Sequence, residues 1–198
     1  MGVSARATLE TLAFMAVTFV VQLVVRTVAP PLEGWLFVLS SPLPLLSPWT
    51  LVTSVYAHGG VMHLLGNAVV LAVFGVAVER VTNRWRFHAF FVTVGAAAGV
   101  AEMLFGVLPF VGAPGVVGAS GAILGLVGYT LAGNDVADTV VAGFEFDARA
   151  QAAAIAVVAA GLALWMAGPG VANVGHFAGL ILGLLAGRGR LLHVDRGL

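Results

Sequence analysis

Four polar side chains that could carry out nucleophilic catalysis lie in otherwise apolar stretches of this sequence of 198 residues. Ser120 follows a glycine-rich segment and opens an apolar run. His63 and Asn67 lie in a second apolar run, and His176 lies in a third. A serine hydroxyl is a weak nucleophile unless a base lies beside it, and neutral imidazole is the usual base. Ser120 and His176 are therefore the predicted nucleophile and general base.

The length of the helix predicted over residues 119–132 sets the depth of Ser120 in a membrane. A helix of about 14 residues is roughly 20 Å long, whereas the hydrocarbon core of a bilayer is about 30 Å thick. If the far end of this helix lies at one membrane face, Ser120 lies roughly 10 Å below the other. His63 and Asn67 are predicted roughly 3 to 9 Å below that face, and His176 roughly 7 Å. We therefore expect the four groups to meet at one depth, in a pocket that water reaches.

The predicted donors around Ser120 suit the negative charge that develops when a carbonyl is attacked. Ser120 begins a helix, so its backbone N–H is free and lies at the positive end of the helix dipole. His63 and Asn67 would add side-chain donors to this oxyanion site. No metal site is predicted, because the sequence has no H-E-x-x-H motif, and two histidines with one amide make a poor zinc site.

The sequence predicts a pair rather than a triad, because no acidic residue is placed to orient His176. Asp135 follows Ser120 by fifteen positions, which is roughly 22 Å along a helix. Glu102 is closer to the outer side and could approach the site, but we expect it to extend toward the membrane interface.

Composition indicates an all-α polytopic membrane protein. The chain is 60% hydrophobic and 9% charged, and its mean hydropathy is +1.05. Its formal net charge is zero, so it has no basic field for nucleic acid. The absence of cysteine excludes disulfides, thiol nucleophiles and thiolate metal sites.

We predict one domain over residues 1–198 with six transmembrane helices, at about 7–28, 61–81, 87–108, 119–132, 150–167 and 171–187. Glu10, Gln22 and Arg26 interrupt the first helix, and their side chains are expected to reach the membrane interfaces. The long connection that follows it contains tryptophans and prolines, which predicts a segment lying in one interface. Arginines flank mainly one side of the helices, so the positive-inside rule predicts cytoplasmic termini and a Ser120 site that opens outward.

Glycines predict how the helices carrying Ser120 and His176 pack. Four glycines recur every fourth position in the last helix, and a Gly-x-x-x-Gly pair starting at Gly121 lies in the Ser120 helix. Small residues at this spacing let helix backbones approach closely in membranes. Because His176 and Gly179 share a helix face, this packing is expected to bring His176 to Ser120.

Three motifs jointly resemble the signatures of the rhomboid intramembrane serine proteases: Gly118-Ala-Ser120-Gly-Ala-x-x-Gly-Leu-x-Gly, His58-x4-His63-x3-Asn67 and Gly175-His176-x-x-Gly179-x-x-x-Gly183. The resemblance extends over about 49–187 and includes Phe74-Gly75-x3-Glu79. It implies a six-helix fold and supports the roles predicted above. It also implies structural supporting roles for His58, Gly118, Gly121 and Gly179. One departure is Trp49-Thr50, where family members often carry Trp-Arg.

The resemblance implies a serine endopeptidase that cleaves transmembrane segments of other membrane proteins, without a metal or cofactor. Its partners would be such substrates and the lipid bilayer, with no nucleic acid, and we expect it in the plasma membrane. Helix 150–167 and the first connection are the predicted substrate gate. A rhomboid-like protein that binds membrane clients without cutting them is the alternative, and a small transporter or channel is a weaker one. Oligomeric state and substrate identity stay open.

Overall fold

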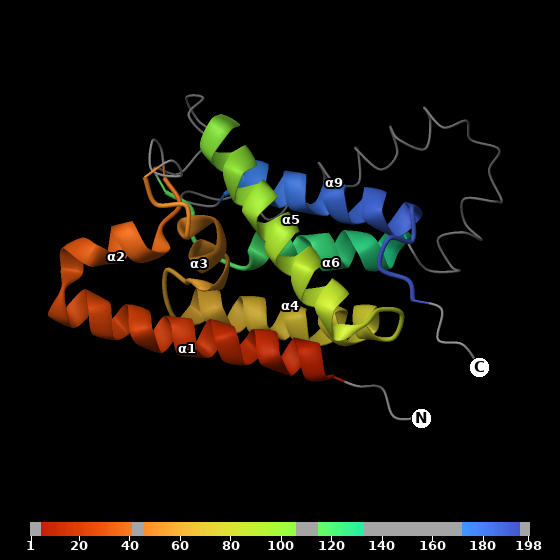
Figure 1. The fold of residues 1–198 in the computed structure, drawn as a ribbon, viewed down its shortest axis with the longest axis horizontal. Helices are drawn as coiled ribbons and strands as arrows, with labels where there is room; N and C mark the ends of the chain where they lie inside the picture. The colour runs from red at the N-terminus through yellow and green to blue at the C-terminus, as the bar shows by residue number, and fades with distance from the viewer. Residues whose placement is uncertain (1–4, 41–45, 106–114, 133–171, 195–198) are drawn as a thin grey trace.

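The computed structural model describes residues 5–40, 46–105, 115–132 and 172–194. The helices in these ranges, labelled as in Figure 1, are α1 (Arg6–Val28), α2 (Pro30–Phe37), α3 (Thr50–Tyr56), α4 (Val61–Glu79), α5 (Arg84–Phe105), α6 (Ser120–Ala132) and α9 (Asn173–Arg188). The predicted helix 150–167 and Asp135 lie outside the described residues, and so does the start of the helix predicted from residue 171. The all-helical class is confirmed for the described ranges, and the count of six helices stays a prediction.

Three of the described helices, α1, α4 and α5, are long and apolar enough to cross a membrane. They contain 23, 19 and 22 residues, and the boundaries predicted from the sequence differ from theirs by at most three positions. Helix α6 is apolar but has only 13 residues, so it is too short to cross a hydrocarbon core of about 30 Å on its own.

Helix α6 lies inside the bundle, packed against α4, α5 and α9 (Figure 1). Every residue from Gly121 to Tyr129 is buried. A helix that is apolar on all sides is stable in this position because each of its faces meets another helix. The surrounding helices thus shield the short helix, and Ser120 at its start, from lipid.

Glycines allow α9 to lie directly on α6. A Cβ atom placed on Gly179 would collide with the carbonyl oxygen of Gly121, and one on Gly183 would collide with that of Gly125. The two backbones therefore touch where side chains would otherwise separate them. This contact sets the height of His176, which lies one turn before Gly179 on the same helix.

The connection between α1 and α4 contains two short helices. Pro30 begins α2, where its fixed φ and missing N–H suit the first helical turn. The Trp49 indole N–H donates to the carbonyl of Trp35 at 3.0 Å, and the two rings lie edge to face with centroids 4.5 Å apart. Leu39 then forms an isolated antiparallel bridge with Val116. This bridge fastens the first connection to the segment that leads into Ser120.

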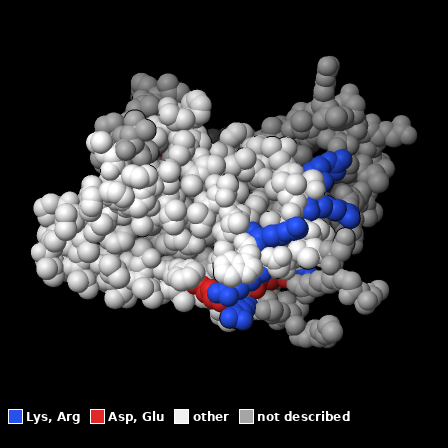
Figure 2. Space-filling model, in the orientation of Figure 1, with Lys and Arg blue, Asp and Glu red and all other residues white. Residues whose placement is uncertain are grey.

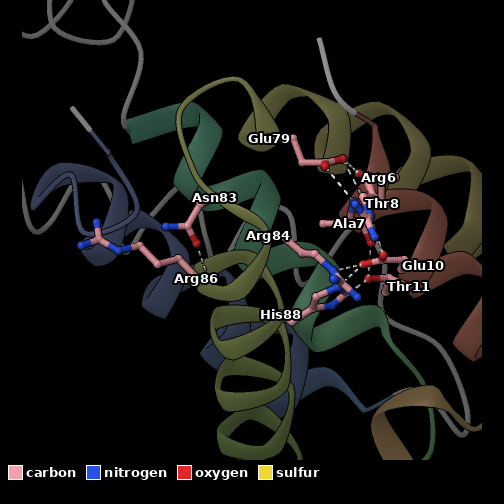
Figure 3. A network of polar contacts seen from close by, with 10 residues as sticks. All are labelled: Arg6, Ala7, Thr8, Glu10, Thr11, Glu79, Asn83, Arg84, Arg86 and His88. Carbon is pink, nitrogen blue, oxygen red and sulfur yellow. Dashed lines mark hydrogen bonds and ion pairs between the residues drawn. The ribbon is translucent and has the colours of Figure 1, made fainter. Parts of the chain in front are cut away.

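Charged residues gather at the opposite end of α4 from His63. On the face shown in Figure 2, the charged side chains of the described residues lie toward one end, and the other described residues of that face are uncharged. Figure 3 shows Glu79 accepting hydrogen bonds from the backbone N–H groups of Ala7 and Thr8, at 2.8 and 3.0 Å. A carboxylate at the free N–H groups of a helix start is favourable. Glu79 therefore joins the end of α4 to the start of α1.

A second carboxylate at this end joins α1 to α5 (Figure 3). Glu10 accepts hydrogen bonds from Arg6 at 3.1 Å and from Arg84 at 2.7 Å. A third partner, the ring nitrogen Nε2 of His88, lies 2.9 Å from the Glu10 carboxylate. The Glu10 side chain is 22% exposed, and its extension toward a membrane interface stays a prediction. These contacts fix the charged end of the bundle, away from the predicted catalytic groups.

Candidate active site

Ser120 is the first residue of α6 and is half-buried. The segment before it is held by backbone hydrogen bonds, because the N–H of Gly118 donates to the carbonyl of Ser54 at 2.9 Å. Val116 also exchanges hydrogen bonds of 2.8 and 3.0 Å with Leu39. The first N–H groups of a helix have no partner inside it. Ser120 thus combines a fixed hydroxyl with backbone donors at the positive end of a helix.

His176 lies beside Ser120. Its Nε2 atom is 2.7 Å from the Ser120 Oγ, within hydrogen-bonding distance, and its ring is buried with 7% exposed. An imidazole protonated on Nδ1 accepts the serine proton at Nε2, which is the arrangement that general-base catalysis requires. The structure therefore brings the predicted nucleophile and base into direct contact.

The second ring nitrogen of His176 has no acidic partner in the part of the chain that the structure describes. Its Nδ1 atom is buried and makes no hydrogen bond there. The mechanism that uses two residues stays a prediction.

Glu102 lies close to the site but does not extend to the interface, so that prediction is wrong. Its side chain is fully buried, and its Oε2 accepts the backbone N–H of Gly175 at 2.8 Å. The cause is the absence of a side chain at Gly175, where an added Cβ would lie 3.0 Å from the carbonyl oxygen of Ala98 on α5. Helices α5 and α9 therefore approach closely enough to enclose the carboxyl group. Glu102 holds the backbone immediately before His176 rather than its ring.

His63 and Asn67 reach the site from α4 and line the same pocket as Ser120. A Cβ placed on Gly118 would lie 2.7 Å from His63 Cε1 and 2.9 Å from its Nε2, so the ring lies against the backbone that precedes Ser120. Asn67 Nδ2 donates one hydrogen bond to the carbonyl of His63 at 2.9 Å. An amide nitrogen has two donors, so Asn67 keeps one for another acceptor.

His58 packs behind His63. The two rings lie edge to face with centroids 5.1 Å apart, and His58 Nδ1 is 3.0 Å from the carbonyl oxygen of Tyr56. Burial, with the neighbouring His63 as a smaller cause, lowers the pKa of His58 to about 4. A neutral His58 ring therefore supports the His63 ring from the side.

Gln22 belongs to this support, although the sequence predicted that it would extend to an interface. It is fully buried in α1, and its Oε1 accepts the backbone N–H of His58 at 2.8 Å. The prediction was wrong because the first connection folds back over α1. A lone amide in an apolar helix was the available signal, since such groups in membranes usually have a partner.

A pocket of about 630 Å³ opens beside the pair, which is within the range of about 300–1,000 Å³ typical of ligand sites. Most of its lining is apolar. The lining residues come from α4, α6 and α9 and from the residues just before each of these helices: Gly59, Met62, His63, Gly66, Asn67, Val70, Gly115, Val116, Val117, Ser120, Ile123, Leu124, Ala172 and His176. Such a site can hold an apolar segment against a nucleophile, a base and several hydrogen-bond donors. Within the described ranges, no three His, Asp or Glu side chains are grouped to hold a metal ion.

Gly118 offers a test of the position of His63. Its φ angle is +131°, which disfavours any residue with a side chain, and an added Cβ would press on the His63 ring. We expect Gly118→Ala to lower the rate of the reaction at Ser120 by about 10²-fold, because displacement by about 1 Å costs that much. Gly59→Ala is the control, because its Cβ would meet only His63 Nδ1 at 3.8 Å. Equal rates in both variants, measured with a reagent that acylates or phosphonylates Ser120, would contradict this.

The fold and the site define an all-helical integral membrane protein with a serine and a histidine in contact inside the bundle. The family model described as the Rhomboid domain matches residues 46–192. The chain therefore belongs to the rhomboid family.

Several relatives share this similarity. The chain is 30% identical over 139 residues to rhomboid protease GluP of Bacillus subtilis, covering 70% of this chain and 25% of the relative. It is 29% identical over 149 residues to RHOMBOID-like protein 5 of Arabidopsis thaliana, covering 75% and 46%. It is 35% identical over 83 residues to the putative rhomboid protease YdcA of Bacillus subtilis, covering 42% and 40%. The chain thus spans less than half the length of each of these relatives.

Proposed function

We propose that the chain is an intramembrane serine endopeptidase that cleaves peptide bonds in or next to transmembrane segments of other membrane proteins. The observation that carries the proposal is the contact of 2.7 Å between Ser120 Oγ and His176 Nε2 on the wall of an apolar pocket. Family membership supports it, because relatives of this chain include proteins named as rhomboid proteases.

In the proposed reaction, His176 removes the proton of the Ser120 hydroxyl as the oxygen attacks the substrate carbonyl. The resulting oxyanion would accept hydrogen bonds from the Ser120 backbone N–H and from the side chains of His63 and Asn67. His176 then gives its proton to the leaving amine, and an acyl group remains on Ser120. Water, activated by the same imidazole, releases this acyl group and restores the serine.

We also propose that the chain is one domain of six transmembrane helices with both termini in the cytoplasm and Ser120 open to the outside. The gathering of charged side chains toward one end of the described residues supports this orientation (Figure 2). Expected substrates are transmembrane segments with helix-destabilising residues, since an intact helix uses its carbonyls in its own hydrogen bonds. The plasma membrane is the proposed location.

The test is labelling of the purified protein in lipid vesicles with a fluorophosphonate, followed by mass spectrometry. A phosphonate on Ser120, absent in Ser120→Ala and in protein unfolded before labelling, is the expected result, because the reagent requires an activated serine. An unlabelled wild type that still binds single-span membrane proteins would instead support the alternative, a rhomboid-like protein that binds clients without cutting them.

A further inference from the structure

We propose that Gly66 sets the size of the substrate side chain that the pocket beside Ser120 accepts, so that a bulky apolar residue fits next to the cleaved bond. This inference rests on the proposed proteolytic function. Gly66 lies in the interior of α4, where glycine destabilises a helix relative to alanine because it loses more backbone freedom on folding. A glycine in such a position needs a reason in packing or in function.

Close packing explains the other glycines of α4, α5, α6 and α9 but not Gly66. A Cβ added to any other glycine in the described parts of α4, α5, α6 and α9 would come within 3.0 Å of a neighbouring atom; these are Gly75, Gly95, Gly99, Gly121, Gly125, Gly128, Gly175, Gly179, Gly183 and Gly187. Among the described residues, a Cβ at Gly66 would meet nothing within 4 Å. Helix α4 therefore gains no close contact with another described residue from this glycine.

The location of Gly66 supplies a functional reason. Met62, Gly66 and Val70 follow one another at intervals of one helical turn and all line the pocket that contains Ser120 and His176. In a helix, long side chains lean toward the N-terminal end and cover the preceding turn. A large side chain at position 66 would thus lie over the turn of Met62, at the catalytic end of the pocket. Glycine keeps this space empty.

The neighbours of the empty space indicate what it holds. Met62 and Val70 on α4 line the pocket together with Ile123 and Leu124 on α6, and none of these four side chains is charged. Apolar walls favour an apolar occupant, and the flexible methionine adapts to different shapes. We therefore expect leucine, methionine or phenylalanine of a substrate segment in this space, rather than a charged side chain.

The experiment compares cleavage of three single-span reporter proteins by the full chain in lipid vesicles. The reporters are identical except for alanine, leucine or phenylalanine immediately before the cleaved bond, which is mapped by mass spectrometry. We expect Gly66→Leu and Gly66→Phe to lose cleavage of the phenylalanine reporter to a greater extent than cleavage of the alanine reporter. They should lower the ratio of phenylalanine to alanine cleavage by at least about tenfold, the usual range for losing room in an apolar pocket.

Two further variants serve as internal checks. Gly66→Ala favours the helix and adds one methyl group, so it folds where larger substitutions fail. It should lower the same ratio by about fourfold and raise the midpoint of thermal unfolding by about 2–4 °C. Val69→Phe adds an aromatic ring to a residue of α4 that is 67% exposed and does not line the pocket. This control should leave the ratio at the wild-type value.

Fluorophosphonate labelling of Ser120 in every variant distinguishes a failure of the inference about Gly66 from a failure of the proposed protease function. A ratio that stays at the wild-type value in Gly66→Ala and in normally labelled Gly66→Leu would overturn the inference and leave the proposed protease standing. A ratio that falls as much in Val69→Phe would also overturn it, since added bulk anywhere on α4 would then suffice. A wild type that is neither labelled nor able to cleave any reporter would overturn the proposed function itself.

Discussion

A protein with alanine at position 176 is expected to cleave a single-span reporter about 10⁴- to 10⁶-fold more slowly than the wild type, the loss typical of removing a catalytic base or nucleophile. The reason is the contact of 2.7 Å between His176 Nε2 and Ser120 Oγ. Without the imidazole, the hydroxyl loses the base that lies in contact with it, and a neutral serine attacks a peptide carbonyl poorly. Initial rates in lipid vesicles measure the effect.

The two residues are expected to act as a unit. Ser120→Ala should cost about as much as His176→Ala, and the double variant should be no slower than either, since each residue is ineffective without the other. His88→Ala is the matched control, because it removes an imidazole at the charged end of the bundle, where His88 contacts Glu10. Its rate should stay within a few-fold of the wild type. Additive losses in the double variant, or a His176→Ala rate within tenfold of the wild type, would exclude the proposed dyad.

The meeting of Ser120 and His176 could be predicted because it depends on regular geometry. Helix length gives depth at 1.5 Å per residue, and glycines four positions apart mark the face where two helices touch. Both quantities can be read along the chain without knowledge of its neighbours. The distance of 2.7 Å between the reactive atoms agrees with that geometry, while their catalytic roles stay predictions.

Gln22 and Glu102 could not be placed in the same way. A long polar side chain in an apolar helix either extends to an interface or is enclosed by another segment, and the sequence pattern is the same in both cases. The outcome depends on the partner. Gln22 is enclosed because the backbone of His58 folds over α1, and Glu102 because Gly175 lets α5 and α9 approach. Neither of these tertiary contacts can be predicted from the residues next to Gln22 or Glu102 in the sequence.

The connection between α1 and α4 was predicted as an interfacial segment, but not its two helices. Prolines and tryptophans predict that it lies in a membrane interface, whereas α2 and α3 depend on contacts distant in sequence. The Thr53 hydroxyl donates to the carbonyl of Leu36 at 2.6 Å, and Leu39 pairs with Val116. Short helices are marginal alone and gain their stability from such contacts. The formation of α2 and α3 therefore depends on tertiary contacts rather than on local sequence.

Gly179→Ala is expected to lower the cleavage rate by about 10²-fold or more, although position 179 does not touch the proposed substrate pocket. The added Cβ would collide with the carbonyl oxygen of Gly121 and lie 2.9 Å from its carbonyl carbon. Backbone atoms cannot rotate away as a flexible side chain can, so α9 must move outward from α6. His176, one turn away, would move with it, and a displacement of about 1 Å at the reacting groups costs about 10²-fold.

Stability and activity should fall together in this variant and more steeply in Gly179→Val. Overpacking a tight contact costs about 1–3 kcal/mol, and a branched side chain between two backbones exceeds that range. Gly189→Ala is the matched control, because its Cβ would lie 3.5 Å or more from other atoms, just beyond the end of the same helix. Thermal unfolding and reporter cleavage should both stay near wild type there. If Gly179→Ala matched Gly189→Ala in both measurements, the direct contact of α6 with α9 would not be what positions His176.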